Sequence, residues 1–109
     1  MKRAALAALL AASLSGCIDH DKELVVENRG SEPVLVDVTQ EHDRWSFQQD
    51  DHWNFELDGF LSWVGRFASV ESVQLIVRRK SDGALLYANE FSLGDFEAFD
   101  KHIVVPVYP

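Results

Sequence analysis

The stretch VQLIVRRKSDGALLYANEF, residues 73–91, decides the fold. Its first part, Val73 to Arg79, is rich in β-branched residues, which suit the surface of a pleated sheet. Ser81-Asp82-Gly83 then supplies turn residues, and Ala84 to Phe91 supplies a second run suited to a strand. Two such runs joined by a short turn that contains glycine predict a β-hairpin. It is the clearest hairpin in the chain.

The same strand pattern extends toward the N-terminus. Residues 24–26 are apolar and lead into Asn28-Arg29-Gly30-Ser31-Glu32-Pro33, a dense cluster of turn residues. Valines then occupy every second position over residues 34–39. This order predicts a strand, a turn and a second strand.

The middle of the chain alternates large aromatic residues with polar ones, over residues 45–47 and again over 53–57. Such alternation predicts two more half-buried strands. Asp58-Gly59 is a two-residue hairpin signal, so residues 60–64 are expected to return as a strand. A short helix is the alternative, because apolar residues of this region also fall at helical spacing: Phe60, Trp63, Val64 and Phe67.

A short helix is expected before the last strand. Ser92-Leu93-Gly94-Asp95 resembles a capping box with Asp in the Glu position, and one or two helical turns after it would bury Leu93, Phe96 and Phe99. Residues 102–108 read as a final strand, and Pro106 places that strand at an edge because proline lacks a backbone donor. About seven short strands within residues 23–109 predict an all-β fold, a small antiparallel β-sandwich.

The N-terminus has the features of an export signal. Lys2 and Arg3 precede the apolar run Ala4 to Ala12, which is too short to span a bilayer, since that takes about 20 apolar residues. The next residues, Leu14-Ser15-Gly16-Cys17, resemble the lipobox of bacterial lipoproteins. That resemblance implies that residues 1–16 are removed and that a diacylglycerol is attached to the sulfur of Cys17. A plain secretory signal with a cysteine near its cleavage point is the alternative.

Cys17 is the only cysteine, so no internal disulfide supports the fold. Residues 17–22 would form a short, polar, lipidated tether, and two or three acyl chains hold a protein almost permanently on its membrane. In lipoproteins of bacteria with two membranes, an aspartate after the cysteine favours the inner membrane. Here that residue is Ile18, so the resemblance implies the outer membrane. The expected location is therefore the cell membrane or outer membrane, lipid-anchored and extracytoplasmic.

The charge balance narrows the classes of partner. The chain has 10 Lys+Arg and 18 Asp+Glu, and removal of residues 1–16 takes away Lys2 and Arg3 but no acid. The mature chain therefore has 8 basic residues against 18 acidic ones, a formal net charge of -10. Nucleic acids and anionic lipid headgroups both require clustered basic residues, so neither is an expected partner. An acidic surface instead attracts cations or basic proteins.

Two polar segments on either side of Trp45 contain the candidate metal ligands His42, Asp43, Asp51 and His52. Imidazole with carboxylate suits zinc, and carboxylates alone suit calcium. Their spacing matches no recognised metal-binding loop, so solvated loop segments are the simpler interpretation. No Gly-x-Ser-x-Gly motif is present and the anchor consumes Cys17, so we predict no catalytic residue, no cofactor and no enzyme activity.

Trp45, Trp53 and Trp63 are the candidate binding residues. Exposed tryptophans suit sugar rings of the envelope, and they also dominate the energies of protein interfaces. The simpler interpretation is that they fill the core of a small domain without disulfides.

The leading hypothesis is therefore a lipid-anchored envelope protein that interacts with another protein or has a structural, accessory role. The first alternative is a module that binds envelope glycans or a divalent metal, and the second is a small enzyme or an enzyme inhibitor. A flat apolar patch beside an unpaired edge strand would favour a protein partner, whereas a groove lined by Trp and carboxylates would favour sugar.

Overall fold

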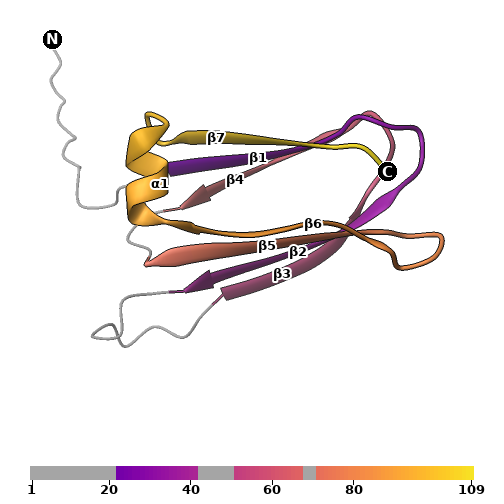
Figure 1. Ribbon diagram of the computed structural model, residues 1–109, viewed down its shortest axis with the longest axis horizontal. Coiled ribbons are helices and arrows are strands. Elements are labelled where there is room, and N and C mark those ends of the chain that lie inside the picture. The colour runs from indigo at the N-terminus through magenta and orange to yellow at the C-terminus, as the bar shows by residue number, and fades with distance from the viewer. Residues whose placement is uncertain (1–21, 42–50, 68–70) are drawn as a thin grey trace, which may run out of the picture.

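The computed structural model describes residues 22–41, 51–67 and 71–109 (Figure 1). The fold is a β-sandwich with one short helix before the last strand, as the sequence predicted. Its elements, in chain order, are β1 (Lys22–Asn28), β2 (Val34–Glu41), β3 (Asp51–Leu57), β4 (Ser62–Phe67), β5 (Ser72–Arg79), β6 (Leu85–Ser92), α1 (Leu93–Ala98) and β7 (His102–Val107). The strand expected around residues 45–47 lies outside the described residues.

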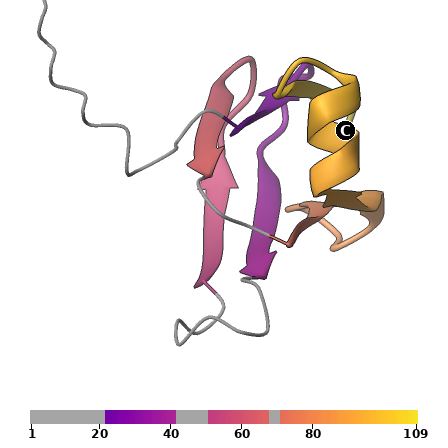
Figure 2. The same ribbon diagram turned by 90° about the vertical axis from the view of Figure 1, so that its left-hand side faces the viewer.

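The strands form two sheets, one with the order β4-β1-β7 and one with the order β3-β2-β5-β6. Figure 2 shows the two sheets stacked, with β3 and β4 along one side and β6, β7 and α1 along the other. Four of the strand pairings are antiparallel, while β1 and β7 run parallel. The first strand, β1, is thus the central strand of the three-stranded sheet, and the last strand, β7, lies beside it at one edge.

Side-chain alternation builds the core. Successive residues of a strand point to opposite faces of its sheet, so the alternate valines of β2 all turn inward and are buried. In β2 and β5, Val36 pairs with Val77 and Val38 pairs with Leu75, so apolar residues lie side by side. The core is completed by residues of both sheets and of the helix: Leu24, Val26, Val34, Leu57, Phe67, Val73, Phe91, Phe96, Ile103, Val105 and Val107.

The predicted hairpin and the predicted cap are both confirmed. β5 and β6 pair antiparallel around the turn, with one bulge between Val77 and Arg78. Ser92 accepts a hydrogen bond from the Asp95 N–H, and the Asp95 carboxylate accepts one from the Ser92 N–H, so the capping box is complete. The helix buries Phe96, but Leu93 and Phe99 are 41% and 64% exposed, so the prediction that these two are buried was wrong.

Residues 62–67 form a strand rather than a helix, but the predicted Asp58-Gly59 hairpin is wrong. β3 and β4 belong to different sheets, and the turn between them carries the chain from one sheet to the other. The reason is that this turn is bonded to the turn that follows β1. The Phe60 N–H donates to the Gly30 carbonyl (3.0 Å), and the Leu61 carbonyl accepts from the Asn28 N–H (2.9 Å). Contacts distant in sequence therefore override the local hairpin signal.

Candidate functional site: a groove between two edge strands

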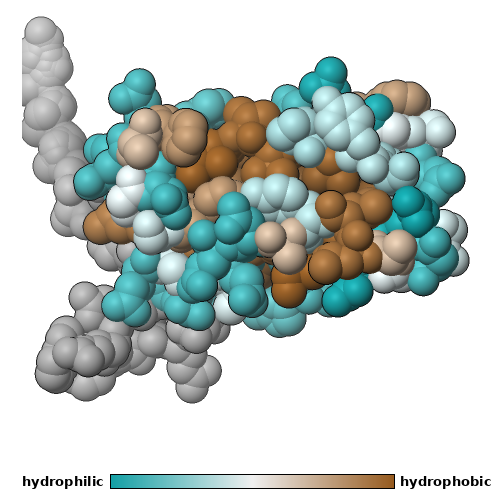
Figure 3. Space-filling view, viewed as in Figure 1, coloured by the Kyte–Doolittle hydropathy of each residue, from teal (hydrophilic) through white to brown (hydrophobic). Residues whose placement is uncertain are grey.

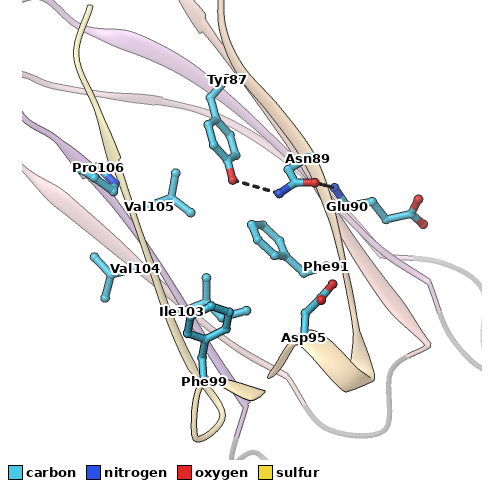
Figure 4. A pocket seen from close by; sticks show the side chains of 10 residues that line it. All are labelled: Tyr87, Asn89, Glu90, Phe91, Asp95, Phe99, Ile103, Val104, Val105 and Pro106. Atoms are coloured by element: carbon cyan, nitrogen blue, oxygen red, sulfur yellow. Dashed lines mark hydrogen bonds between the residues drawn. The ribbon is translucent and has the colours of Figure 1, made fainter. Parts of the chain in front are cut away.

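The described part of the molecule has a hollow on the side where β6 and β7 face each other. This β6–β7 groove has a volume of about 620 Å³. Figure 3, drawn from this side, shows apolar surface across the middle of the face. Figure 4 shows that one wall comes from β6, the other from β7, and one end from α1. The lining residues are Tyr87, Asn89, Glu90, Phe91, Asp95, Phe99, Ile103, Val104, Val105 and Pro106.

The groove exists because the two sheets have unequal numbers of strands. The three-stranded sheet ends at β7, and no further described strand covers the inner face of β6. Tyr87, Asn89 and Phe91 pair in register with the buried residues Val77, Leu75 and Val73, so they lie on the inner face of their sheet. Only Phe91 is buried, whereas Asn89 is exposed. Positions that alternation assigns to the core are therefore open to solvent along β6.

Aromatic residues close the opposite side of the sandwich. Across β3 and β4, Phe55 packs against Trp63 with their rings 5.1 Å apart, and Trp53 packs edge-on against Phe67 at 6.1 Å. Trp53 remains 39% exposed and Trp63 is half-buried. Neither tryptophan lines the β6–β7 groove. Trp45, the third candidate, lies outside the described residues.

The polar groups of the groove are few and mostly bonded to one another. The Asn89 amide Nδ2 donates to the Tyr87 hydroxyl (3.2 Å), and its Oδ1 accepts from the Glu90 N–H (2.8 Å). Among the lining residues only Glu90 and Asp95 carry a formal charge. The Glu90 carboxylate points to the other face of its sheet, where it accepts a hydrogen bond from Ser72 Oγ (2.9 Å), so the groove combines an apolar floor, formed by Phe91, Ile103 and Val105, with one carboxylate, that of Asp95.

The outer face of the three-stranded sheet has a charged cluster where β7 begins. The Glu23 carboxylate accepts a hydrogen bond from Arg66 Nε (2.9 Å) and lies 2.9 Å from His102 Nδ1. The hydrogen bond from Arg66, and to a smaller extent the one from His102, hold the pKa of Glu23 below its ordinary value, because both favour the ionised carboxylate. The three side chains come from the neighbouring strands β4, β1 and β7, so the cluster links all three strands across the solvent-exposed face.

Only two of the four candidate metal ligands are among the described residues. His42 and Asp43 lie outside the described residues, and Asp51 and His52 are exposed on β3. The His52 Nε2 atom lies 2.5 Å from an Asp37 carboxylate oxygen on β2, so this imidazole has a carboxylate neighbour. Within residues 22–41, 51–67 and 71–109, no three side chains of His, Cys, Asp or Glu are grouped to hold a metal ion. Cys17, the predicted lipid attachment point, lies before the first described residue.

Comparison with protein-family models, curated proteins and solved structures finds no significant match. Among the described residues, no helix is long and apolar enough to cross a bilayer. Sequence reasoning missed the groove, although β6 carried a signal of it. Over residues 85–92 the inward positions are Tyr87, Asn89 and Phe91, and the asparagine interrupts the apolar pattern that a covered strand would have.

Proposed function

We propose that this protein is a lipid-anchored protein of the bacterial envelope that binds another protein through the β6–β7 groove. The observation that carries the proposal is that an apolar groove lies between two edge strands that lack a further partner in the described part of the chain. Unpaired strand edges and exposed apolar surface are both features of protein-binding sites.

The composition of the groove supports a protein ligand over a sugar. A groove lined by tryptophan and carboxylates would favour a sugar, yet Trp53 and Trp63 pack at the other side of the sandwich. The exposed apolar side chain at the groove is instead that of Phe99, 64% exposed, beside a floor of aliphatic and aromatic side chains. Burying apolar surface contributes about 25 cal/mol per Å², so a partner that covers this groove gains affinity from it.

The anchor is the second part of the proposal, and it is supported by the Leu14-Ser15-Gly16-Cys17 motif and the export signal before it. Lys22, the last residue of the expected tether, is instead the first residue of β1 and is buried. A lipid on Cys17 would therefore place the domain, through residues 17–21, close to the membrane surface. A Cys17→Ser variant expressed in a bacterial host is expected to move from the membrane fraction to the soluble fraction. Retention of that variant in the membrane fraction would show that the anchor is wrong.

Binding can be tested by photocrosslinking in intact cells that carry the lipidated protein. A photoreactive phenylalanine analogue at position 99 lies at the groove, and the same analogue at position 60, a phenylalanine that is 73% exposed and lies outside the groove, is the matched control. We expect a discrete crosslinked protein from position 99 and none from position 60. The absence of a crosslink from position 99, with the protein correctly localised, would contradict the proposal.

A further inference from the structure

We infer that the groove accepts an extended segment of the partner protein, an inference that rests on the proposed function. The segment would pair with β7 and become a fourth strand of the three-stranded sheet. The segment would carry small apolar residues at every second position and Lys or Arg between or beside them. Its inward side chains would cover the part of β6 that the three-stranded sheet leaves open. This is a strand-addition mode of recognition, in which the backbone supplies hydrogen bonds and alternate side chains fill the groove.

The backbone of β7 has groups available for such pairing. The Lys101 carbonyl accepts from the Glu23 N–H (2.8 Å) and the Val107 carbonyl from the Arg29 N–H (2.9 Å). In a parallel pair, alternate residues turn their backbone groups toward the same neighbour. Residues 101, 103, 105 and 107 therefore face β1, and residues 102, 104 and 106 face the free edge. Pro106 has no N–H and the His102 N–H donates to the Phe99 carbonyl, so the donor presented at that edge is the Val104 N–H.

The edge of β6 is less suited to pairing. The Arg79 N–H donates to the Ala84 carbonyl, so odd-numbered residues of β5 face β6. With the register of the pair, this places the backbone groups of residues 88, 90 and 92 at the free edge of β6. The Glu90 N–H already donates to Asn89 and the Ser92 N–H to Asp95. Side chains thus occupy two of the three donors at the β6 edge and leave that of Ala88. A strand beside β7 would lie opposite β6 and cover its open inner face, whereas a strand added to β6 would lie beyond the groove, so β7 is the edge we assign.

The groove also sets the size of the side chains that fit. The inward residues of a strand beside β7 would face Tyr87, Asn89 and Phe91 across the gap between the sheets. Phe91, Ile103 and Val105 are each less than 10% exposed and already fill the floor, so small or β-branched side chains suit the remaining space. β7 has six residues and α1 closes one end of the groove, so the paired part of the segment is short.

Charge complementarity selects the class of partner. Glu90 and Asp95 are the only formally charged residues that line the groove, and the mature chain has a net charge of -10. Of these two, the Asp95 carboxylate faces the groove, whereas the Glu90 carboxylate accepts a hydrogen bond from Ser72 Oγ on the other face of its sheet. Like charges oppose the approach of a second copy of this chain, whereas Lys or Arg beside the apolar positions of a segment would meet the Asp95 carboxylate. The occupant we assign is therefore a basic, alternately apolar segment of a different protein.

Position 104 provides a matched pair of variants. Val104→Pro removes the outward N–H and, because that N–H faces away from β1, leaves the pairing between β1 and β7 in place. Val104→Ala keeps the N–H and shortens the side chain. Each variant, in the lipidated full-length protein, is combined with the photoreactive residue at position 99. We expect the crosslink to persist in Val104→Ala and to be lost in Val104→Pro, with the same melting temperature for both purified proteins to confirm folding.

A synthetic peptide tests the chemistry of the occupant directly. The probe is an eight-residue peptide that alternates valine with threonine and ends in lysines. Its controls are the same peptide with a central backbone amide methylated and a peptide of the same composition with the valines contiguous. We expect the alternating peptide to bind and both controls to bind about tenfold more weakly, a change of about 1.4 kcal/mol, because each loses a backbone hydrogen bond or apolar contacts.

The outcomes separate this inference from the proposed function. A crosslink from position 99 that persists in Val104→Pro, or equal binding of the methylated and unmethylated peptides, would overturn strand addition while leaving the groove as a protein-binding site. A crosslink from position 99 to a second copy of this chain would overturn the assigned partner. Loss of every crosslink from position 99 in the unsubstituted protein would instead overturn the proposed function.

Discussion

At the scale of single residues, Gly65 shows how one side of the sandwich is closed. A Cβ atom at this position would overlap the indole ring of Trp63 and approach Cζ of Phe67 to 3.0 Å. The absence of a side chain therefore allows Trp63 to lie across its own strand and pack against Phe55 on β3. Glycine is required here for close approach, and not for an unusual backbone angle.

Gly65→Ala should therefore destabilise the protein by about 1–3 kcal/mol, the usual cost of an added group in a packed region. Urea unfolding of the purified domain measures the change. Gly94→Ala is the control, because a Cβ there meets only Ser92 Oγ at 3.7 Å and replaces glycine within α1. That control should be neutral or stabilising by up to about 1 kcal/mol. Equal stability of Gly65→Ala and the native protein would show that Trp63 does not need this space.

Glu23 gives a prediction for pH dependence. Its bonds to Arg66 and His102 lower its pKa in the folded state below the ordinary value of 4.5. Its contribution to stability is therefore present above that ordinary pKa and is lost as the pH falls through the folded-state value. When the pH is lowered from about 7 to about 3.5, the free energy of unfolding should therefore fall less in Glu23→Gln than in the native protein. Urea unfolding of each protein at the two pH values measures this difference.

The control for Glu23 is Glu97→Gln. Glu97 is exposed on α1 and is not part of the cluster of Glu23, Arg66 and His102. Its replacement should leave the loss of stability between the two pH values as it is in the native protein. If Glu23→Gln and Glu97→Gln behave alike, the cluster on the outer face does not contribute to acid stability.

At the scale of elements, α1 is a short helix held in place by its cap and by one side chain. It has six residues, and isolated helices of this length are not stable in water. Phe96 anchors it, since its ring lies 6.4 Å from Phe67 and 6.3 Å from Phe91. The cap thus positions the residue that fills one end of the core, and it positions Phe99 at the end of the groove.

Ser92→Ala should cost about 1 kcal/mol, because the Asp95 N–H loses its acceptor at the start of the helix. Ser92→Thr keeps a hydroxyl acceptor and should retain most of that stability. Hydrogen exchange of the α1 amides, compared with global unfolding in urea, would show the change. An unchanged stability in Ser92→Ala would mean that packing of Phe96 alone holds the helix.

At the scale of the whole molecule, the two sides of the sandwich differ in a way that separates stability from binding. The side formed by β3 and β4 is closed by aromatic pairs, while the side formed by β6 and β7 is open. The first contributes to folding, and the second leaves apolar surface exposed, which is the surface that we propose as a binding site. The acidic charge of the chain keeps such an open surface soluble.

Trp63→Ala should therefore destabilise the protein by about 2–4 kcal/mol, somewhat less than a fully buried aromatic residue would. Val104→Ala, a truncation on the open side, should change the free energy of unfolding by less than about 1 kcal/mol. Both are measured by urea unfolding monitored by circular dichroism. Similar losses in the two variants would show that the β6–β7 side also carries part of the folding energy.

Local pattern was sufficient for most elements. The alternating residues of β2, the hairpin of β5 and β6, the capping box at Ser92 and the edge position of Pro106 were all predicted, because each depends on neighbours within a few residues. The failures involve distant contacts. Asp58-Gly59 has the composition of a hairpin turn, but its bonds to the turn after β1 direct β4 into the other sheet. Leu93 and Phe99 are apolar, yet they lie where no other element covers them.

The sequence by itself determined an acidic all-β chain with a short capped helix and with its one cysteine at the end of a lipobox-like motif, because these features are properties of composition and of local spacing. The tertiary structure alone decided which strands share a sheet. Sheet order depends on the pairing of segments far apart in the chain, such as β1 with β7. That order leaves three strands opposite four, and it turns Tyr87, Asn89 and Val105 from ordinary strand residues into the walls of a groove.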